Sequence, residues 1–207
     1  MKRGRFITLE GIEGAGKSTL LQTLSEALQS RGTAVCTTRE PGGTALAEDI
    51  RRLVLERRAD GMPAATELLL MFAARAAHVS QRIEPALARG EWVLCDRFTD
   101  ASRAYQGGGR GLDARWIESL AQVAHPGLSP DLTLLLDLPV EAGLARARGR
   151  RDGGDRFEDE TVAFFGRVRE RYLEIAASEP ARVQVLDATM SSDALLEQAL
   201  RRVDALS

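Results

Sequence analysis

The stretch FITLEGIEGAGKSTL, residues 6–20, decides the fold. It begins as an apolar run that is typical of a buried strand and continues with leucines at helical spacing. Between the two segments lies the pattern GxxxxGK(S/T), filled here by Gly11, Gly16, Lys17 and Ser18. Glycine allows the backbone to curl so that its N–H groups point inward, and the following helix adds the positive end of its dipole. The stretch therefore predicts a loop that holds phosphate.

A glycine-rich turn can also serve only to reverse the chain, but the complete motif between a strand and a helix favours nucleotide binding. In this interpretation backbone amides hold the β-phosphate, Lys17 reaches the β- and γ-oxygens, and the Ser18 hydroxyl binds Mg²⁺. We therefore expect a nucleoside triphosphate and Mg²⁺ to be bound. The residues expected to contact the nucleotide are Gly11, Ile12, Glu13, Gly14, Ala15, Gly16, Lys17, Ser18 and Thr19.

The chain of 207 residues is long enough for one α/β domain with a well-buried core, so a single domain over 1–207 is expected. With 28% charged residues and a formal net charge of −2, it lacks the positive excess that is usual in nucleic-acid-binding proteins. No apolar stretch approaches the roughly 18 residues that span a bilayer, and MKRGRF leads directly into the first strand. Cys36 and Cys95 lie in apolar runs without metal-ligand spacing, which predicts buried thiols. We expect a cytoplasmic protein that binds neither nucleic acid nor membrane.

Strand-like apolar runs recur along the chain at 6–9, 33–38, 91–96, 131–138 and 183–187, separated by segments of helical periodicity. This alternation predicts an α/β fold, a three-layer sandwich in which a five-stranded, mostly parallel sheet is flanked by helices. Ligands of such sheets bind beyond the carboxyl ends of the strands.

The helical segments are expected to be amphipathic. The first should end near Gly32, where glycine can adopt a left-handed conformation, and Pro85 should kink or restart a longer helix. The residues expected on the inner faces are Leu46, Ile50, Leu53 and Val54 in the second helix, Leu68, Leu69, Phe72, Ala76, Val79 and Ile83 in the longer one, and Thr161, Phe165, Val168, Tyr172 and Ile175 in a later one.

Three stretches are too polar or too rich in glycine to be explained by packing: TREPGGT at 38–44, CDRFTDASRAYQGGGRG at 95–111 and RARGRRDGGDR at 146–156. The third carries five arginines and could be a solvated charged face. Its glycines and its expected place beside a phosphate site favour a mobile basic lid at about 146–158.

The motifs LEGIEGAGKST, TREPGGT, FAAR, CDRFTDASRAYQGGGRG and DRFE, in this order and at these intervals, resemble those of bacterial thymidylate kinases. The resemblance extends from about Phe6 to Asp187. It implies a P-loop nucleoside monophosphate kinase fold, and a homodimer that uses Mg²⁺. The implied reaction transfers the γ-phosphoryl group of ATP to dTMP and gives dTDP and ADP, a step of dTTP synthesis for DNA replication.

The resemblance also implies roles for residues of the acceptor site. Arg39 and Arg97 would grip the acceptor phosphate, and Glu13 would accept a hydrogen bond from its 3′-hydroxyl. Phe72 would stack on thymine, although it could instead belong to the core. Met71 is the alternative, because some relatives place the aromatic residue four positions before the arginine of FAAR.

The other acceptor contacts implied by the resemblance concern the base and the sugar. Arg75 would hydrogen-bond the base edge, and Tyr105 would crowd any 2′-hydroxyl and so favour deoxyribose. The implied substrate contacts are completed by Ser102 and Gln106.

The implied acceptor is a phosphate oxygen that is largely deprotonated at pH 7, because the second pKa of a monophosphate is near 6. No general base is required, and the difficulty becomes the repulsion between two anions. Asp96, at the end of the apolar run EWVLCD, is the candidate to orient hydrated Mg²⁺ and to hold Arg97. Asp137 follows another apolar run and is the alternative.

The phosphate loop GIEGAGKS contains no arginine, whereas other members of the family place one at or near the position of Gly14. The transferred phosphoryl still needs a cation besides Lys17 and Mg²⁺. We therefore predict that the lid supplies it, with Arg148 and Arg151 as candidates and Arg156 as a brace.

Two other functions remain as alternatives. A kinase that phosphorylates a nucleoside or a small alcohol would share the fold but would need a base near the acceptor. A regulatory GTPase or mechanical ATPase is disfavoured, because the sequence contains no asparagine for the guanine-reading NKxD motif and no DxxG.

Overall fold

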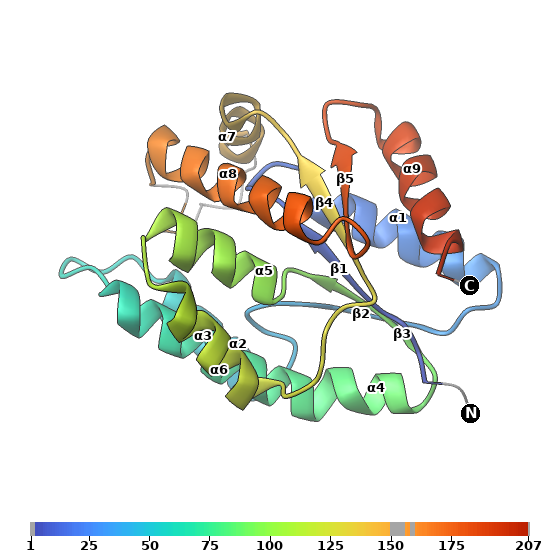
Figure 1. Ribbon diagram of the computed structural model, residues 1–207, viewed down its shortest axis with the longest axis horizontal. Coiled ribbons are helices and arrows are strands. Elements are labelled where there is room, and N and C mark those ends of the chain that lie inside the picture. The colour runs from blue at the N-terminus through green and yellow to red at the C-terminus, as the bar shows by residue number, and fades with distance from the viewer. Residues whose placement is uncertain (1–2, 150–155, 158–159, 207) are drawn as a thin grey trace.

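A five-stranded parallel sheet runs through the middle of the molecule in the computed structural model, which describes residues 3–149, 156–157 and 160–206 (Figure 1). The strand order is β2-β3-β1-β4-β5, and each neighbouring pair is parallel. This confirms the predicted sheet. The strands are β1 (Phe6–Glu10), β2 (Val35–Arg39), β3 (Trp92–Asp96), β4 (Leu132–Asp137) and β5 (Val183–Asp187).

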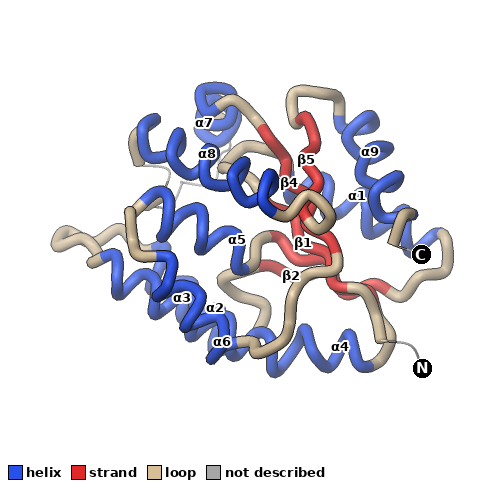
Figure 2. Tube along the Cα trace, viewed as in Figure 1, coloured by secondary structure: helices blue, strands red, loops and turns tan. Residues whose placement is uncertain are grey.

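Helices cover both faces of this sheet, as the predicted three-layer sandwich requires (Figure 2). Helices α1 and α9 pack on one face, while α4 and α8 pack on the other. The helices are α1 (Lys17–Ser30), α2 (Ala45–Leu55), α3 (Ala64–His78), α4 (Glu84–Ala88), α5 (Thr99–Ser102), α6 (Ala114–Ala124), α7 (Val140–Arg148), α8 (Val162–Ser178) and α9 (Ser192–Asp204), with the π-helical segments η1 (Val79–Ile83) and η2 (Arg103–Gly109). Among the described helices, none combines the length and apolar character needed to cross a membrane.

The loop between β1 and α1 depends on glycine for close approach. A Cβ at Gly11 would lie 2.5 Å from the carbonyl oxygen of Leu136, and one at Gly14 would lie 2.1 Å from that of Gly143. Both glycines also have positive φ, a conformation that side chains disfavour. Helix α1 ends at Ser30, and Gly32 is left-handed with φ of 82°, as predicted. The glycines therefore let the loop fit against the segment that carries β4 and α7.

The predicted inner faces of two helices are partly wrong. In α2 the buried residues are Ala47, Ile50 and Val54, whereas Leu46 and Leu53 are 54% and 46% exposed. The apolar positions of α2 exceed one helical face, and packing against α3 selects the face that contains Ala47. Leu69 of α3 is likewise 57% exposed.

The predicted break near Pro85 is confirmed, because α3 passes into η1 and then into α4. Pro85 lies in the first turn of α4, where its missing N–H is tolerated. The later helix is also confirmed as α8, but the prediction of Thr161 on its inner face is wrong. Thr161 is exposed and precedes the helix, and its side chain caps it by accepting a hydrogen bond from the backbone N–H of Phe164. Cys95 is buried, but Cys36 is only partly buried, so the prediction for that thiol is wrong. Cys36 lies on β2, at the edge of the sheet, where fewer elements cover it.

Candidate active site

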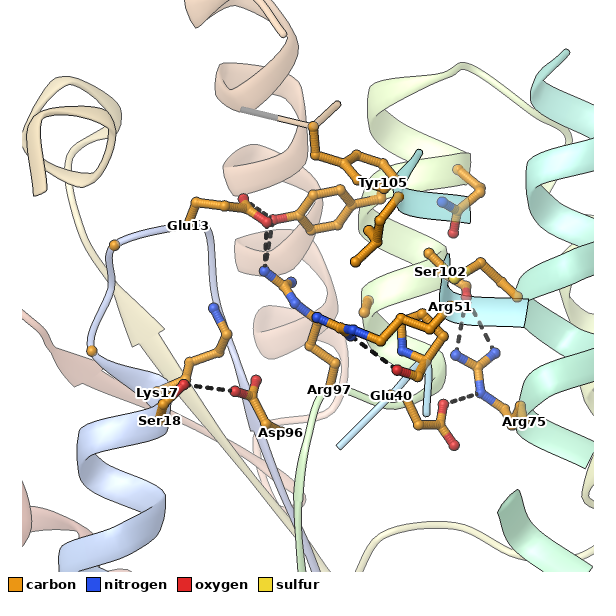
Figure 3. A pocket seen from close by; sticks show the side chains of 18 of the residues that line it. Glu13, Lys17, Ser18, Glu40, Arg51, Arg75, Asp96, Arg97, Ser102 and Tyr105 are labelled. Carbon is orange, nitrogen blue, oxygen red and sulfur yellow. Dashed lines mark hydrogen bonds and ion pairs between the residues drawn. The ribbon is translucent and has the colours of Figure 1, made fainter. Parts of the chain in front are cut away.

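A cavity of about 350 Å³ lies beyond the carboxyl ends of β1, β2 and β3 (Figure 3). Its walls come from the β1–α1 loop, the segment after β2, helices α2 and α3, and the chain from Asp96 through η2. Segments far apart in the sequence thus meet where parallel sheets bind their ligands. The predicted site residues that line this cavity are Glu13, Gly14, Gly16, Lys17, Ser18, Thr19, Arg75, Asp96, Arg97, Ser102, Tyr105 and Gln106.

Lys17 lies folded over the phosphate loop at the start of α1. Its Nζ donates to the carbonyl oxygens of Gly11 at 3.0 Å and Ile12 at 2.9 Å. Burial, and then the nearby charge of Arg97, lower the pKa of Lys17 to about 8. An anion beside this ammonium would favour its protonated form. Lys17 is therefore placed to meet a phosphate group in the cavity.

Ser18 and Asp96 bring two kinds of oxygen together at the start of α1 and the end of β3. The Ser18 hydroxyl donates to Asp96 Oδ2 at 3.2 Å (Figure 3). Asp96 Oδ1 is buried and has no hydrogen-bond partner within the described part of the chain. Buried carboxylate oxygens normally have a partner, and a hydroxyl with a carboxylate suits Mg²⁺, which keeps most of its water. The donor set fits a hydrated magnesium ion.

Arg97 follows β3 directly and occupies a left-handed conformation with φ of 72°. Such backbone strain costs about 1–3 kcal/mol and is concentrated at functional sites. Its guanidinium donates to Glu13 Oε1 at 2.8 Å, to the Tyr105 hydroxyl at 3.1 Å and to the Gly11 carbonyl at 3.1 Å. Tyr105 in turn donates to Glu13 Oε2 at 2.5 Å. These side chains tie the phosphate loop to η2 across one side of the cavity (Figure 3).

Glu10, the last residue of β1, supports Arg97 from behind and was not predicted as a site residue. Its carboxylate accepts hydrogen bonds from the backbone N–H of Phe98 and from the Tyr172 hydroxyl, both at 2.7 Å. Burial, and then the charge of Asp100, raise the pKa of Glu10 to about 7. The only sequence signal is a glutamate that ends an otherwise apolar strand. The bond to Phe98 fixes the backbone next to the strained residue.

Arg75 projects from α3 into the inner end of the cavity and is buried. It donates through Nε to Glu40 Oε2 at 2.6 Å and through its terminal nitrogens to Ser102 Oγ at 3.2 Å (Figure 3). Burial opposes the charge of Glu40, but Arg75 and a hydrogen bond from His78 hold the pKa of Glu40 below its ordinary value. The arrangement fixes a guanidinium in a water-poor pocket.

Two of the residues predicted to contact the acceptor are not brought to this cavity. Arg39 forms an ion pair with Glu48 at 2.9 Å and lines a separate, shallow depression. Phe72 is buried with Leu68 in a core cluster, which is the alternative considered for it above. Met71 lines the cavity instead, because residues four apart on a helix share a face and Met71 lies four positions before Arg75.

Arg51 of α2 was missed by the sequence analysis, although it lines the cavity and donates to the Pro41 carbonyl at 2.9 Å. It has an arginine neighbour, Arg52, and the local pattern gave no means of choosing between them. Helix rotation decides, because Arg51 turns toward the cavity while Arg52 pairs with Asp49 on the exposed side.

The remaining predicted loop residues differ in their surroundings. Gly11 and Ile12 contribute carbonyl oxygens to Lys17, and the Ile12 side chain is buried in the core. Ala15 lines a second cavity of about 300 Å³ on the other side of the loop. Gly14, Gly16 and Thr19 line both cavities. The loop therefore separates two hollows.

The structure also locates Asp137, the alternative to Asp96, and the described residues of the basic stretch at 146–156. Asp137 pairs with Arg169 at 2.7 Å and does not line the main cavity. Arg148 is the exposed last residue of α7, and Arg151 lies outside the described residues. Arg156 pairs with buried Glu67 at 2.7 Å and bonds to the Val54 carbonyl, which ties it to α2 and α3.

Known proteins share this sequence and this fold. The family model described as thymidylate kinase matches residues 9–199. The thymidylate kinase of Alkalilimnicola ehrlichii is 56% identical over 203 residues, which cover 97% of this chain and 94% of that protein. That of Pseudomonas putida is 58% identical over 205 residues, 98% of this chain and 94% of that protein.

A solved structure extends the similarity to three dimensions. The crystal structure of thymidylate kinase from Ehrlichia chaffeensis superposes with a TM-score of 0.78 and 32% sequence identity. The match covers 98% of this chain and 99% of that one. Sequence, fold and cavity agree, and the chain belongs to the thymidylate kinase family, the enzymes that phosphorylate dTMP to dTDP with ATP.

Proposed function

We propose that this chain transfers the γ-phosphoryl group of ATP to dTMP inside the main cavity. The phosphates of ATP lie on the loop around Lys17, and dTMP lies between Arg97 and Arg75. The observation that supports this most strongly is that one cavity is lined both by the phosphate loop and by two arginines, the buried Arg75 and the partly buried Arg97. No general base is needed, because the acceptor phosphate is already ionised at pH 7.

Cations around the acceptor phosphate offset its repulsion from ATP. Arg97 and Arg51 both line the cavity together with Lys17. We assign the phosphate grip to Arg97 and Arg51. Arg39, which the resemblance suggested for this role, is held by Glu48 outside the cavity.

The nucleoside part of dTMP fits the inner end of the cavity. Glu13 accepts a hydrogen bond from the 3′-hydroxyl, and the Tyr105 ring crowds any 2′-hydroxyl. Met71 supplies an apolar, polarisable thioether for the flat face of thymine. Arg75 and Gln106 read the base edge, with Ser102 beside them.

Ser18 and Asp96 would hold hydrated Mg²⁺ beside the phosphate loop. The unpartnered Asp96 Oδ1 supports this assignment, because it offers an acceptor to a water of the hydrated ion. When bound, the ion neutralises charge that develops on the transferred phosphoryl group. Ser18 and Asp96 orient it.

The adenosine part of ATP occupies the second cavity. This hollow is bounded by Gly16 and Thr19 of the loop and by Arg146 of α7, whose side chain donates to the Ala188 carbonyl at 3.1 Å. Its position across the loop from the main cavity separates donor from acceptor, as the reaction requires. The loop then holds the phosphates between them.

A cation from the basic stretch at about 146–158 completes the site. The loop GIEGAGKS has no arginine, and the stretch begins on α7 beside the second cavity. Arg148 and Arg151 remain the candidates. Alanine at the acting arginine should lower kcat at least about a hundredfold while leaving dTMP affinity almost unchanged. Near wild-type kcat in both variants would exclude the role.

A homodimer explains the exposed apolar side chains on three neighbouring helices. Helix α3 contacts both α2 and α6. The exposed residues are Leu46 and Leu53 of α2, Leu69 of α3, and Trp116 and Val123 of α6. We expect Leu46→Glu with Leu69→Glu to give a monomer in sedimentation, while Val185→Glu on the edge strand β5 stays dimeric.

The cytoplasm is the proposed location, since both cysteines are free thiols, which is typical of a reducing compartment.

The identity of the acceptor is tested by a coupled ATP-consumption assay across the common nucleoside monophosphates and thymidine. We expect the highest kcat/KM with dTMP. A preference for thymidine or for another monophosphate would overturn the proposed reaction.

A further inference from the structure

Glu67 of α3 lies directly behind the wall of the main cavity and is fully buried. Its carboxylate accepts a hydrogen bond from Gln106 Nε2 at 2.7 Å. It also forms ion pairs with Arg110 at 3.1 Å and with Arg156 at 2.7 Å. These partners come from η2, from the turn after it and from the end of the basic stretch. A buried carboxylate without such partners would be strongly destabilising, so the cluster must form as a unit.

Gln106 connects this cluster to the cavity, because it is almost fully buried and yet lines the cavity wall. A glutamine amide has a donor end, the NH₂ group, and an acceptor end, the carbonyl oxygen. Glu67 can only accept, so the NH₂ group must face it. The carbonyl oxygen is then the polar end left for a ligand. A rotated amide would place its oxygen against a carboxylate and leave the NH₂ group without this partner.

Glu40 fixes a neighbouring group in the same way. It accepts from Arg75 Nε at 2.6 Å, and the Arg75 guanidinium carries only donors. The inner wall therefore presents a donor, Arg75, and an acceptor, the Gln106 carbonyl oxygen, each set from behind by a buried carboxylate. A base edge with a carbonyl oxygen next to a ring N–H complements this pair. Thymine and uracil have that edge, whereas cytosine presents an amino group next to a bare ring nitrogen.

We propose that Glu67 is a positioning residue that selects the acceptor base by fixing the orientation of the Gln106 amide. The inference rests on the proposed place of the dTMP base at this wall. Arg110 and Arg156 hold the carboxylate in turn, and Arg110 is itself paired with Glu160 at 2.5 Å. Glu67 thus acts on specificity without lining the cavity.

The test compares dTMP with its N3-methyl analogue, in which a methyl group replaces the hydrogen of the ring N–H and both carbonyl groups are kept. In the wild type we expect the analogue to have a kcat/KM at least about tenfold lower, because the Gln106 oxygen loses its partner. The measured quantity is the ratio of kcat/KM for dTMP to kcat/KM for the analogue. Glu67→Gln can present either end of its amide to Gln106, so this ratio should fall at least about threefold. Arg156→Gln breaks the same ion pair from the other side but keeps the acceptor that faces Gln106. This matched control should retain the wild-type ratio.

Gln106→Leu distinguishes the positioning role of Glu67 from the base contact of Gln106. It removes the amide that would contact the base, so the ratio should come close to one. If Gln106→Leu lowers the ratio but Glu67→Gln does not, Glu67 has no positioning role and the base site stands. If Gln106→Leu leaves the ratio unchanged, the base lies elsewhere and the proposed placement of dTMP fails as well. Glu67→Asp provides a second variant that keeps the charge and withdraws the carboxylate from Gln106. Its ratio should also fall, and circular dichroism verifies that each variant is folded.

Discussion

Asp96→Asn should separate catalysis from stability, because this carboxylate is poorly satisfied by the protein itself. One of its oxygens is buried without a partner in the described part of the chain, and the other accepts a 3.2 Å hydrogen bond from Ser18. An unsatisfied buried group costs about 1–3 kcal/mol, and more when it is charged. Its removal should therefore not weaken the fold.

We expect Asp96→Asn to leave the free energy of unfolding unchanged or higher, and to lower kcat. Loss of the charge relieves desolvation, while the buried ammonium of Lys17 loses a favourable neighbour, which is a smaller effect in the other direction. We expect the free energy of unfolding of the ligand-free protein to stay within about 0.5 kcal/mol or to rise by up to about 1 kcal/mol. Disturbing the metal should lower kcat by about 10²–10³, equivalent to about 3–4 kcal/mol of transition-state stabilisation.

The assay measures kcat over a range of Mg²⁺ concentrations and unfolding by urea without nucleotide. Asp137→Asn is the matched control at the end of β4, which is separated from β3 by β1, and its carboxylate pairs with Arg169 outside the cavity. Its kcat should stay within about twofold, and its stability should fall by less than about 1 kcal/mol. The reasoning is refuted if Asp96→Asn keeps half of the wild-type kcat, or if it loses more than about 2 kcal/mol of stability.

Three further outcomes are expected. Lys17→Ala should abolish turnover and preserve the circular dichroism spectrum, since the side chain bonds to the loop carbonyls of Gly11 and Ile12 and not to a distant segment among the described residues. A lost spectrum would show a structural role. Tyr105→Phe removes a buried hydroxyl between Glu13 and Arg97, so the free energy of unfolding should fall by about 1–3 kcal/mol. The melting temperature should fall by about 2–4 °C for each kcal/mol. An unchanged melting temperature would contradict this. The raised pKa of Glu10 means that the folded state binds more protons between about pH 4.5 and 7, so stability should fall by up to about 3 kcal/mol as the pH rises through that window. The difference between wild type and Glu10→Gln in urea unfolding should therefore vary with pH, and a constant difference would exclude this titration.

The sheet and the phosphate loop could be predicted because their signals are local. Apolar runs located all five strands to within two residues at either end, and the glycine pattern located the turn into α1. Helix faces were less predictable, because α2 and α3 carry more apolar residues than one face can bury. Only their packing against each other shows that Leu46, Leu53 and Leu69 point outward.

Two residues that were predicted to contact the acceptor lie outside the cavity, and no local pattern shows this. The rotation of α3 places Met71 rather than Phe72 at the cavity wall, and Glu48 pairs with Arg39 outside it. Both placements depend on contacts between residues that no local pattern connects. The buried glutamates were missed for the same reason, since a buried carboxylate is stable only when distant segments bring it partners.

The three buried glutamates hold groups that surround the cavity. Glu10, Glu40 and Glu67 are all fully or almost fully buried, and each bonds a group next to the cavity: the backbone after Arg97, the Arg75 guanidinium and the Gln106 amide. Removing one partner leaves the other polar group buried and unpaired, so loss of these glutamates should lower stability as well as activity. Asp96 differs, because one of its oxygens has no partner in the described part of the chain, so we expect its loss to lower activity alone. The sign of the stability change therefore distinguishes the carboxylates that hold the wall from the carboxylate that we propose to orient Mg²⁺.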